Sequence, residues 1–274
     1  MTSFGKIVYT QFLNSLGGIE ADVTVTRLSE TRYMVVTPAA TTVRDLSWMT
    51  RHRGDFAVSL FDATASEAVL CIMGPNARAL LQAAAPWHDW SNEAPPFGTM
   101  HQIEIGLGLA RAHRVSYVGE LGWALNIATD QAAHVLEHLL QVGEAFDLTL
   151  CGLHAMDSCR LEKGFRHFGR DAVLRKKDSG LSSRMLQFRL TDPKPLLYHA
   201  EPILRDGAVG GYLTSGAYGH TPGGAVGLGY VPCAGEAMAD LLASSYQIEI
   251  AGVRHTAEAS LKPLYDATSA HTKV

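Results

Sequence analysis

Three short stretches of the chain hold residue types that can do chemistry, each beside a glycine. In LNSLGGIEADVTVTRL, the carboxylate Asp22 follows a glycine pair at the mouth of an otherwise apolar strand. In RVSYVGELGWAL, the aromatic Tyr117 and the carboxylate Glu120 lie in a glycine-rich turn. GLHAMDSCRLEKGFRHFG, at 152–169, has the pattern of a helix carrying charge among apolar residues. Such groups can serve acid–base chemistry or ligand binding, although each stretch alone also fits a hairpin turn or a helix ending at glycine.

Common nucleotide and metal motifs are missing from the sequence. It contains no GxxxxGK[ST], no GxGxxG between a strand and a helix, and no HExxH or GxSxG. His134 and His138 share a helix face, but no third ligand is spaced nearby. No pair of the four cysteines has CxxC spacing. We therefore expect no metal site and no dinucleotide site.

Composition and charge bound the class of protein. The 274 residues, 47% hydrophobic and 18% charged, are typical of a globular chain of two units. The net charge is −4, and the basic run at 175–177 has the character of a solvated face, so no nucleic-acid partner is expected. Neither a signal-peptide pattern nor an apolar run of about 18 residues occurs, so no membrane partner is expected. Apolar neighbours predict buried free cysteine thiols and a reducing, cytoplasmic location.

The first part of the chain mixes strand and helix patterns. Val23 and Val25 alternate with threonines, which is the period of a half-buried strand. Near one helical stripe lie Val43, Leu46 and Trp48–Met49. Strands are expected at 6–14, 22–28, 32–38, 56–64, 68–74, 101–116 and 123–129. Helices are expected at 41–53, at 74–85, at 130–146 with Asp130 as its cap, and at 153–165.

Turn-rich composition at 178–196 separates this part from a second one. Short strands with glycine and proline turns follow, a pattern typical of a small antiparallel barrel or sandwich. We therefore predict an α+β fold, with a mixed domain at 1–181 and a small C-terminal antiparallel β-barrel at 182–274.

In combination and order, several strings resemble one known family. They are YTQFLNSLGGIEADVTVTRL, SYVGELGW, GLHAMDSCRLEKGFRHFG, LTSGAYGHTPGGAVGLGYV and ASLKPLYD, and they span nearly the whole chain. The sequence resembles the folate-binding T-protein of the glycine cleavage system, an aminomethyltransferase. Within that group it is most similar to the T-protein-like C-terminal half of dimethylglycine and sarcosine dehydrogenases. The resemblance implies a folate-binding domain followed by a barrel.

The resemblance also implies a reaction and residues for it. A one-carbon unit on an amine donor, as an aminomethyl group or iminium, would pass to tetrahydrofolate. Asp22 occupies the position of the family's catalytic carboxylate, where a fixed anion stabilises developing positive charge and orients a proton. Tyr9 and Tyr117 match aromatic positions of the folate pocket, and Glu120 belongs to the same turn as Tyr117. Arg160 could pair with a folate carboxylate, or equally with a carboxylate on its own helix.

One departure from the family concerns folate affinity. The family has a glutamate shortly after its YxGExG turn, where it grips the amino-pyrimidine edge of the pterin. Here that position is Ala124. A carboxylate that accepts from two N–H donors is worth a few kcal/mol, so its absence predicts weaker folate binding.

Two further departures concern length. Family members have some tens of residues before the KIVYTQ strand, and a segment between strings that correspond to Gly169 and Arg170 here. We therefore expect a chain that is truncated at its N-terminus and carries an internal deletion. This leaves open a degenerate or fragmentary module without catalysis, part of a larger flavin-dependent dehydrogenase, or a demethylase that acts on another methyl donor. A flavin dehydrogenase domain or subunit is the expected protein partner of an active module.

Overall fold

The computed structural model describes residues 3–15, 18–94, 96–165 and 181–274. Its first layer is an antiparallel sheet in the order β1-β2-β3, formed by β1 (Ile7–Leu13), β2 (Ile19–Arg27) and β3 (Tyr33–Val36). The turn η1 (Ala39–Thr41) leads into helix α1 (Thr42–His52), which contacts β2. Residues directly opposite each other in antiparallel strands point to the same face. The β1–β2 register therefore gathers polar side chains on one face of this hairpin, pairing Tyr9 with Thr24 and Gln11 with Asp22.

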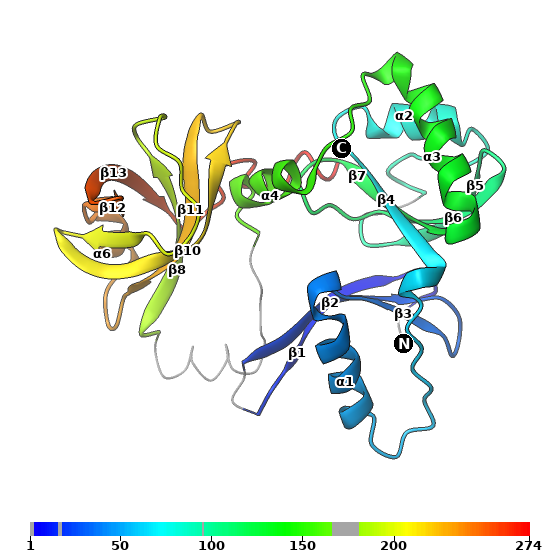
Figure 1. The fold of residues 1–274 in the computed structure, drawn as a ribbon, viewed down its shortest axis with the longest axis horizontal. Coiled ribbons are helices and arrows are strands. Elements are labelled where there is room, and N and C mark those ends of the chain that lie inside the picture. Colours follow the sequence, from blue (N-terminus) through cyan, green and yellow to red (C-terminus); the bar gives the residue numbers. More distant parts are fainter. Residues whose placement is uncertain (1–2, 16–17, 95, 166–180) are drawn as a thin grey trace.

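A second layer follows in the chain (Figure 1). Its strands are β4 (Glu67–Met73), β5 (Met100–Ile105), β6 (Gly108–His113) and β7 (Gly122–Ala128), in the order β4-β7-β6-β5. Helices α2 (Ala77–Ala84) and α3 (Thr129–Gly143) lie on one face of this sheet, where alternate strand residues such as Trp123 and Leu125 form a buried cluster with them. Short turns η2 (Thr64–Ser66) and η3 (Glu144–Phe146) flank the layer.

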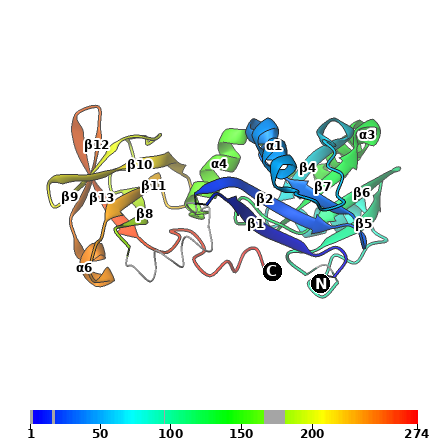
Figure 2. The ribbon, with the colours of Figure 1, turned by 90° about the horizontal axis from the view of Figure 1, so that it is seen from below.

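The third part is a closed antiparallel barrel, linked to the rest through helix α4 (Leu153–Glu162), which packs on two of the barrel strands (Figures 1 and 2). Its strands close in the order β10-β11-β8-β13-β12-β9. Their bounds, with that of the short helix beside them, are β8 (Ser183–Leu190), β9 (Pro202–Arg205), β10 (Ala208–Gly219), β11 (Gly224–Pro232), α6 (Met238–Ala243), β12 (Tyr246–Ile250) and β13 (Val253–Ser260). The predicted α+β class with a small C-terminal barrel is confirmed.

Several local predictions were wrong. Residues 56–64 form no strand, and Phe56 and Phe61 are exposed. Val43 is also exposed, and the buried residue of α1 is Asp45, which accepts hydrogen bonds from threonine hydroxyls before and at the start of the helix. The cap of α3 is Ala128, without a side-chain hydrogen bond, and Asp130 lies inside the first turn.

The cysteine prediction was mostly wrong as well. Cys71 and Cys151 are exposed and Cys159 is partly buried, so Cys233 is the one buried thiol of the four. All four are free. The expected deletion between Gly169 and Arg170, and the basic run at 175–177, lie outside the described residues. In the part of the chain that is described, no helix is both long and apolar enough to cross a membrane.

Candidate functional site

Tyr9, Gln11 and Asp22 form a polar cluster on one face of the β1–β2 hairpin. Gln11 Nε2 donates a hydrogen bond to Asp22 Oδ1 at 3.2 Å. Tyr9 hydrogen-bonds with the Asp22 carboxylate, and burial first and this carboxylate second raise the pKa of Tyr9 well above its usual range. The phenol therefore stays neutral, and its hydroxyl donates to the anion. About half of the Tyr9 side chain remains exposed, so the cluster is open to a ligand.

Tyr117 belongs to the same neighbourhood, although it comes from the turn before β7. An electrostatic interaction with Tyr117 is the last and smallest of the causes that raise the pKa of Tyr9, so the two phenol groups lie within electrostatic range of each other. Tyr117 is 48% exposed. Two residues later Gly119 has a φ of +84°, a left-handed conformation that favours glycine, and its N–H donates to Ser116 Oγ at 3.0 Å. The structure thus brings together three predicted residues, Tyr9, Asp22 and Tyr117.

Glu120 and Arg160 have other partners. The Glu120 carboxylate accepts a hydrogen bond from the Tyr265 hydroxyl and lies 3.6 Å from His271 Nδ1. Arg160 donates to Asp157 Oδ1 from Nη2 at 2.6 Å and from Nε at 3.0 Å. Of the two interpretations of Arg160, the helix ion pair is the one present here. Folate contacts by Glu120 and Arg160 stay predictions.

Ala124 lies in the middle of the sheet formed by β4, β6 and β7. It pairs with Cys71 on one side and with His113 on the other, so these three side chains share a face. His113 is 3% exposed, and burial lowers the pKa of its imidazole. Its Nδ1 lies 3.0 Å from Asn126 Nδ2. A neutral imidazole, rather than a carboxylate, is therefore the chemical group beside position 124.

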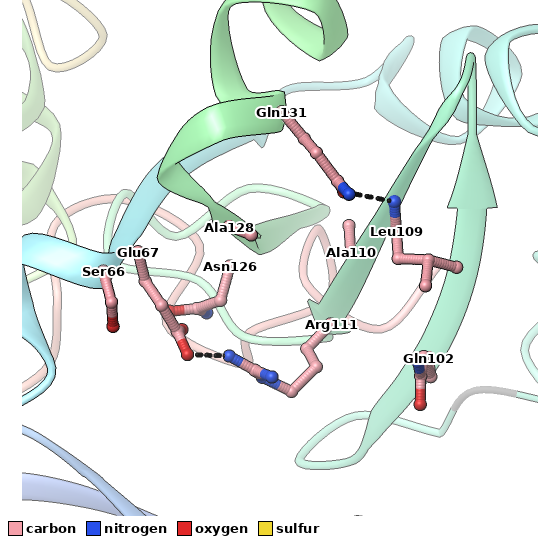
Figure 3. A pocket seen from close by; sticks show the side chains of 9 residues that line it. All are labelled: Ser66, Glu67, Gln102, Leu109, Ala110, Arg111, Asn126, Ala128 and Gln131. Atoms are coloured by element: carbon pink, nitrogen blue, oxygen red, sulfur yellow. Dashed lines mark hydrogen bonds and ion pairs between the residues drawn. The ribbon is translucent and has the colours of Figure 1, made fainter.

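A pocket of about 230 Å³ opens further along this face (Figure 3). Glu67 on β4 and Arg111 on β6 form an ion pair across it, and Leu109 N–H donates to Gln131 Oε1 at 2.9 Å. None of the predicted site residues lines the pocket. Because the two charges neutralise each other, the pocket offers no net charge to a ligand.

The histidines considered as metal ligands bind backbone groups instead. His134 Nε2 accepts from Leu107 N–H at 3.0 Å, and His138 Nε2 lies 2.9 Å from the carbonyl oxygen of Ala84. Across the described ranges, no group of three or more histidine, cysteine, aspartate or glutamate side chains is arranged to hold a metal ion.

Sequence reasoning missed Gln11, Lys163 and Tyr265. Gln11 had a signal, because a strand places residues two apart on the same face and Tyr9 was already a candidate. Lys163 and Tyr265 had no signal of that kind, since their partners Asp266 and Glu120 are far away in the chain.

Together, the closed C-terminal barrel, the preceding mixed layers and the tyrosine–carboxylate cluster define a T-protein-like two-part fold. Two family models match the chain: the GCVT N-terminal domain over residues 1–182 and the glycine cleavage T-protein C-terminal barrel domain over residues 184–266. The chain belongs to the glycine cleavage T-protein family.

Individual relatives agree with this assignment. The chain is 37% identical to 4-methylaminobutanoate oxidase (formaldehyde-forming) of Paenarthrobacter nicotinovorans, over 95% of this chain and 34% of that protein. It is 30% identical to human mitochondrial sarcosine dehydrogenase, over 98% of this chain and 34% of that protein. The chain thus spans about a third of the length of these two relatives. The crystal structure of aminomethyltransferase T from Bartonella henselae has the same fold, with a TM-score of 0.79 at 22% identity, covering 97% of this chain and 78% of that one.

Proposed function

We propose that this chain is a tetrahydrofolate-dependent one-carbon transfer module, acting in glycine, sarcosine or dimethylglycine catabolism. Its division into a folate-binding part at 1–181 and a barrel at 182–274 is part of this proposal. The observation that carries it is the Tyr9–Gln11–Asp22 cluster, with Tyr117 close by, in a chain of this family. A flavin dehydrogenase domain or subunit is the proposed source of the oxidised one-carbon donor, and the names of the longer relatives support this choice.

The exposed residues suit a pterin. Two half-exposed aromatic rings, Tyr9 and Tyr117, offer faces for a flat heterocycle, and the amide of Gln11 and the carboxylate of Asp22 offer polar partners for its edge. Bound tetrahydrofolate would supply the nitrogen that accepts the one-carbon unit. Tyr9, Tyr117, Glu120 and Arg160 are the proposed binding residues.

Asp22 is the proposed catalytic residue. Its carboxylate is held by Gln11 Nε2 and by the Tyr9 hydroxyl, which fixes its orientation. A fixed anion stabilises positive charge that develops on the donor carbon, and it can take the proton that the attacking nitrogen loses. Because the pKa of Tyr9 is raised, the phenol adds no second negative charge to the site.

The first test separates binding from catalysis. Calorimetric titration of the protein with 5-formyltetrahydrofolate is expected to show saturable binding, and its absence would end the binding half of the proposal. Asp22→Asn is expected to lower turnover at least about 100-fold in a reaction that contains the flavin dehydrogenase and a sarcosine or dimethylglycine donor. The matched control is Glu20→Gln, on the same strand, whose carboxylate accepts from Asn14 Nδ2 and should leave turnover unchanged. Unchanged turnover in Asp22→Asn would end the catalytic half.

The second candidate function is a module without catalysis that binds folate weakly or serves as a structural part of a larger enzyme. The observation that favours it is Ala124, which stands where the family has a glutamate. The side chain beside it is the buried imidazole of His113. Ala124→Glu is expected to raise folate affinity about tenfold if the rest of the pocket is intact. Ala124→Gln controls for side-chain size. Equal affinities of the two variants would favour the second candidate.

A further inference from the structure

The segment after β13, residues 261–274, leaves the barrel and returns to the α/β layers, past α4 (Figures 1 and 2). Its first contacts are with α4 and the barrel wall. Leu264 N–H donates to Gln187 Oε1 at 2.9 Å, and Gln187 Nε2 in turn donates to the carbonyl oxygen of Leu161 at 2.5 Å. Gln187 is fully buried. One amide side chain of β8 therefore joins the end of α4 to this tail.

A buried ion pair fixes the next residues of the tail. Lys163 Nζ donates to Asp266 Oδ2 at 2.8 Å and to the Asp266 carbonyl oxygen at 2.5 Å, with side chains that are 1% and 3% exposed. The same carboxylate accepts from the backbone N–H groups of Ala270 at 2.8 Å and His271 at 3.2 Å. Burial alone would raise the pKa of Asp266, but these donors, Lys163 foremost, lower it to about 2. The carboxylate thus accepts from Lys163 and from two backbone N–H groups, the kind of additional hydrogen bonding that a buried ion pair requires.

The turn that carries Tyr117 is contacted both by Lys163 and by the tail residues on either side of Asp266. The aliphatic stem of Lys163 lies against Gly119, so closely that a Cβ atom at position 119 would be 2.7 Å from Lys163 Cδ. On the other side, the Tyr265 hydroxyl donates to the Glu120 carboxylate, and His271 lies 3.6 Å from the same group. The turn is therefore held on consecutive residues, by packing at Gly119 and by a charge-assisted hydrogen bond at Glu120.

We propose that Lys163, Tyr265 and Asp266 form a clasp that positions the 117–122 turn, so that the C-terminal tail sets how well Tyr117 presents its ring to the folate ligand. This inference rests on the proposed function. The three are positioning residues, because they act through the turn. Glu120 is the residue of the turn to which the clasp is hydrogen-bonded. The clasp couples the barrel side of the molecule to a site that lies in the layers before it.

The test compares two tyrosines that each lose one hydrogen bond donated by the phenol, a partly buried one at Tyr265 and a buried one at Tyr246. Tyr265→Phe removes the donor to Glu120, and Tyr246→Phe, the matched control, removes the donor to the Leu241 carbonyl oxygen inside the barrel. Both are expected to lower Tm comparably, by about 2–4 °C. Only Tyr265→Phe is expected to weaken 5-formyltetrahydrofolate binding, by about tenfold in Kd. Unchanged Kd in Tyr265→Phe, or an equal loss in Tyr246→Phe, would overturn the proposal.

A second measurement needs no ligand, so it separates failure of the clasp from failure of the proposed function. Amide hydrogen exchange in residues 117–122 is expected to become about tenfold faster in Tyr265→Phe and in Asp266→Asn, and to stay unchanged in Tyr246→Phe. If the wild-type protein does not bind folate, the proposed function fails and the clasp is judged on exchange alone. Unchanged exchange in both variants would then reject it.

Discussion

The C-terminal barrel and the first layer bury their apolar side chains to very different extents. All six barrel strands contribute to one buried cluster, and closure leaves no free strand edge. Among the described residues, by contrast, no buried cluster contains a residue before Ile72. Val43 in α1, and Phe56 and Phe61 in the connection that follows α1, are more than three quarters exposed. The barrel is a packed core, whereas the first layer is a sheet and a helix with little core of their own.

This difference places the candidate catalytic residue on the less packed part. Asp22 lies in β2, while the tail that positions its neighbouring turn is anchored to α4 and the barrel. A layer with few buried apolar contacts opens at low free energy, and a ligand that binds its closed form stabilises it in proportion to concentration and affinity. We therefore expect folate, when bound, to protect β1 and β2 far more than the barrel strands.

The largest expected loss of stability is in the barrel core. Phe188 is fully buried and packs edge-on against Tyr246, with ring centroids 5.4 Å apart. Phe188→Ala is expected to lower the free energy of unfolding by about 3–5 kcal/mol, because it removes a large apolar side chain and leaves a cavity. Denaturant titration followed by circular dichroism measures it. A loss below about 1 kcal/mol would mean that the barrel is not the well-packed half of the comparison.

An effect of intermediate size is expected at the Lys163–Asp266 ion pair, where the free energy of unfolding should depend on pH. Asp266 has a pKa of about 2 when folded, against an ordinary value of about 3.9 when unfolded. The folded carboxylate thus binds protons less readily, so its stabilisation is complete above about pH 5 and is lost as pH falls from about 4 toward 2. Allowing for solvent screening, we expect a loss of about 1–2 kcal/mol across that window.

Urea titrations at pH 5, 4 and 3 measure this dependence, and Asp266→Asn is the comparison. The wild-type protein should lose more stability than the variant over the same range. Parallel curves for the two proteins would show that the Lys163–Asp266 pair contributes no pH-dependent stability.

The smallest expected change in stability is in the exposed connection after α1. Phe61 is 85% exposed, so Phe61→Ser should change the free energy of unfolding by no more than about 0.5 kcal/mol. Phe188→Ala is its matched counterpart, since the same aromatic residue type is shortened in the other region. A loss of several kcal/mol in Phe61→Ser would remove the contrast between the two regions, because it would show that this side chain is buried in solution.

Patterns within one element were readable from the sequence, and contacts between elements were not. Strand period and turn residues identified the barrel and the β1–β2 hairpin. The same period wrongly predicted a strand at 56–64, because alternation describes a strand that has a partner and says nothing of whether one is there. The stripe on α1 failed in a similar way. Val43 has the spacing of a buried residue, but the threonines before the helix bury Asp45 instead.

The same distinction, between contacts within one element and contacts between distant elements, applies to the candidate site. Tyr9 and Asp22 lie on adjoining strands of one hairpin, so their proximity followed from a short range of sequence. The sequence could not assign Glu120 to Tyr265, since 145 residues separate them. Nor could it choose between a folate carboxylate and a carboxylate of the same helix as the partner of Arg160, because Asp157, three residues before it, is within reach.

The exposed connection after α1 has a practical consequence. Residues 51–59, RHRGDFAVS, are all exposed, and two of them are arginines that trypsin recognises. A cut after Arg53 would separate β1, β2, β3 and α1 from a fragment, 54–274, that keeps every residue of the three buried clusters. Limited digestion followed by mass spectrometry should therefore yield a long-lived fragment that keeps the barrel and has lost Asp22.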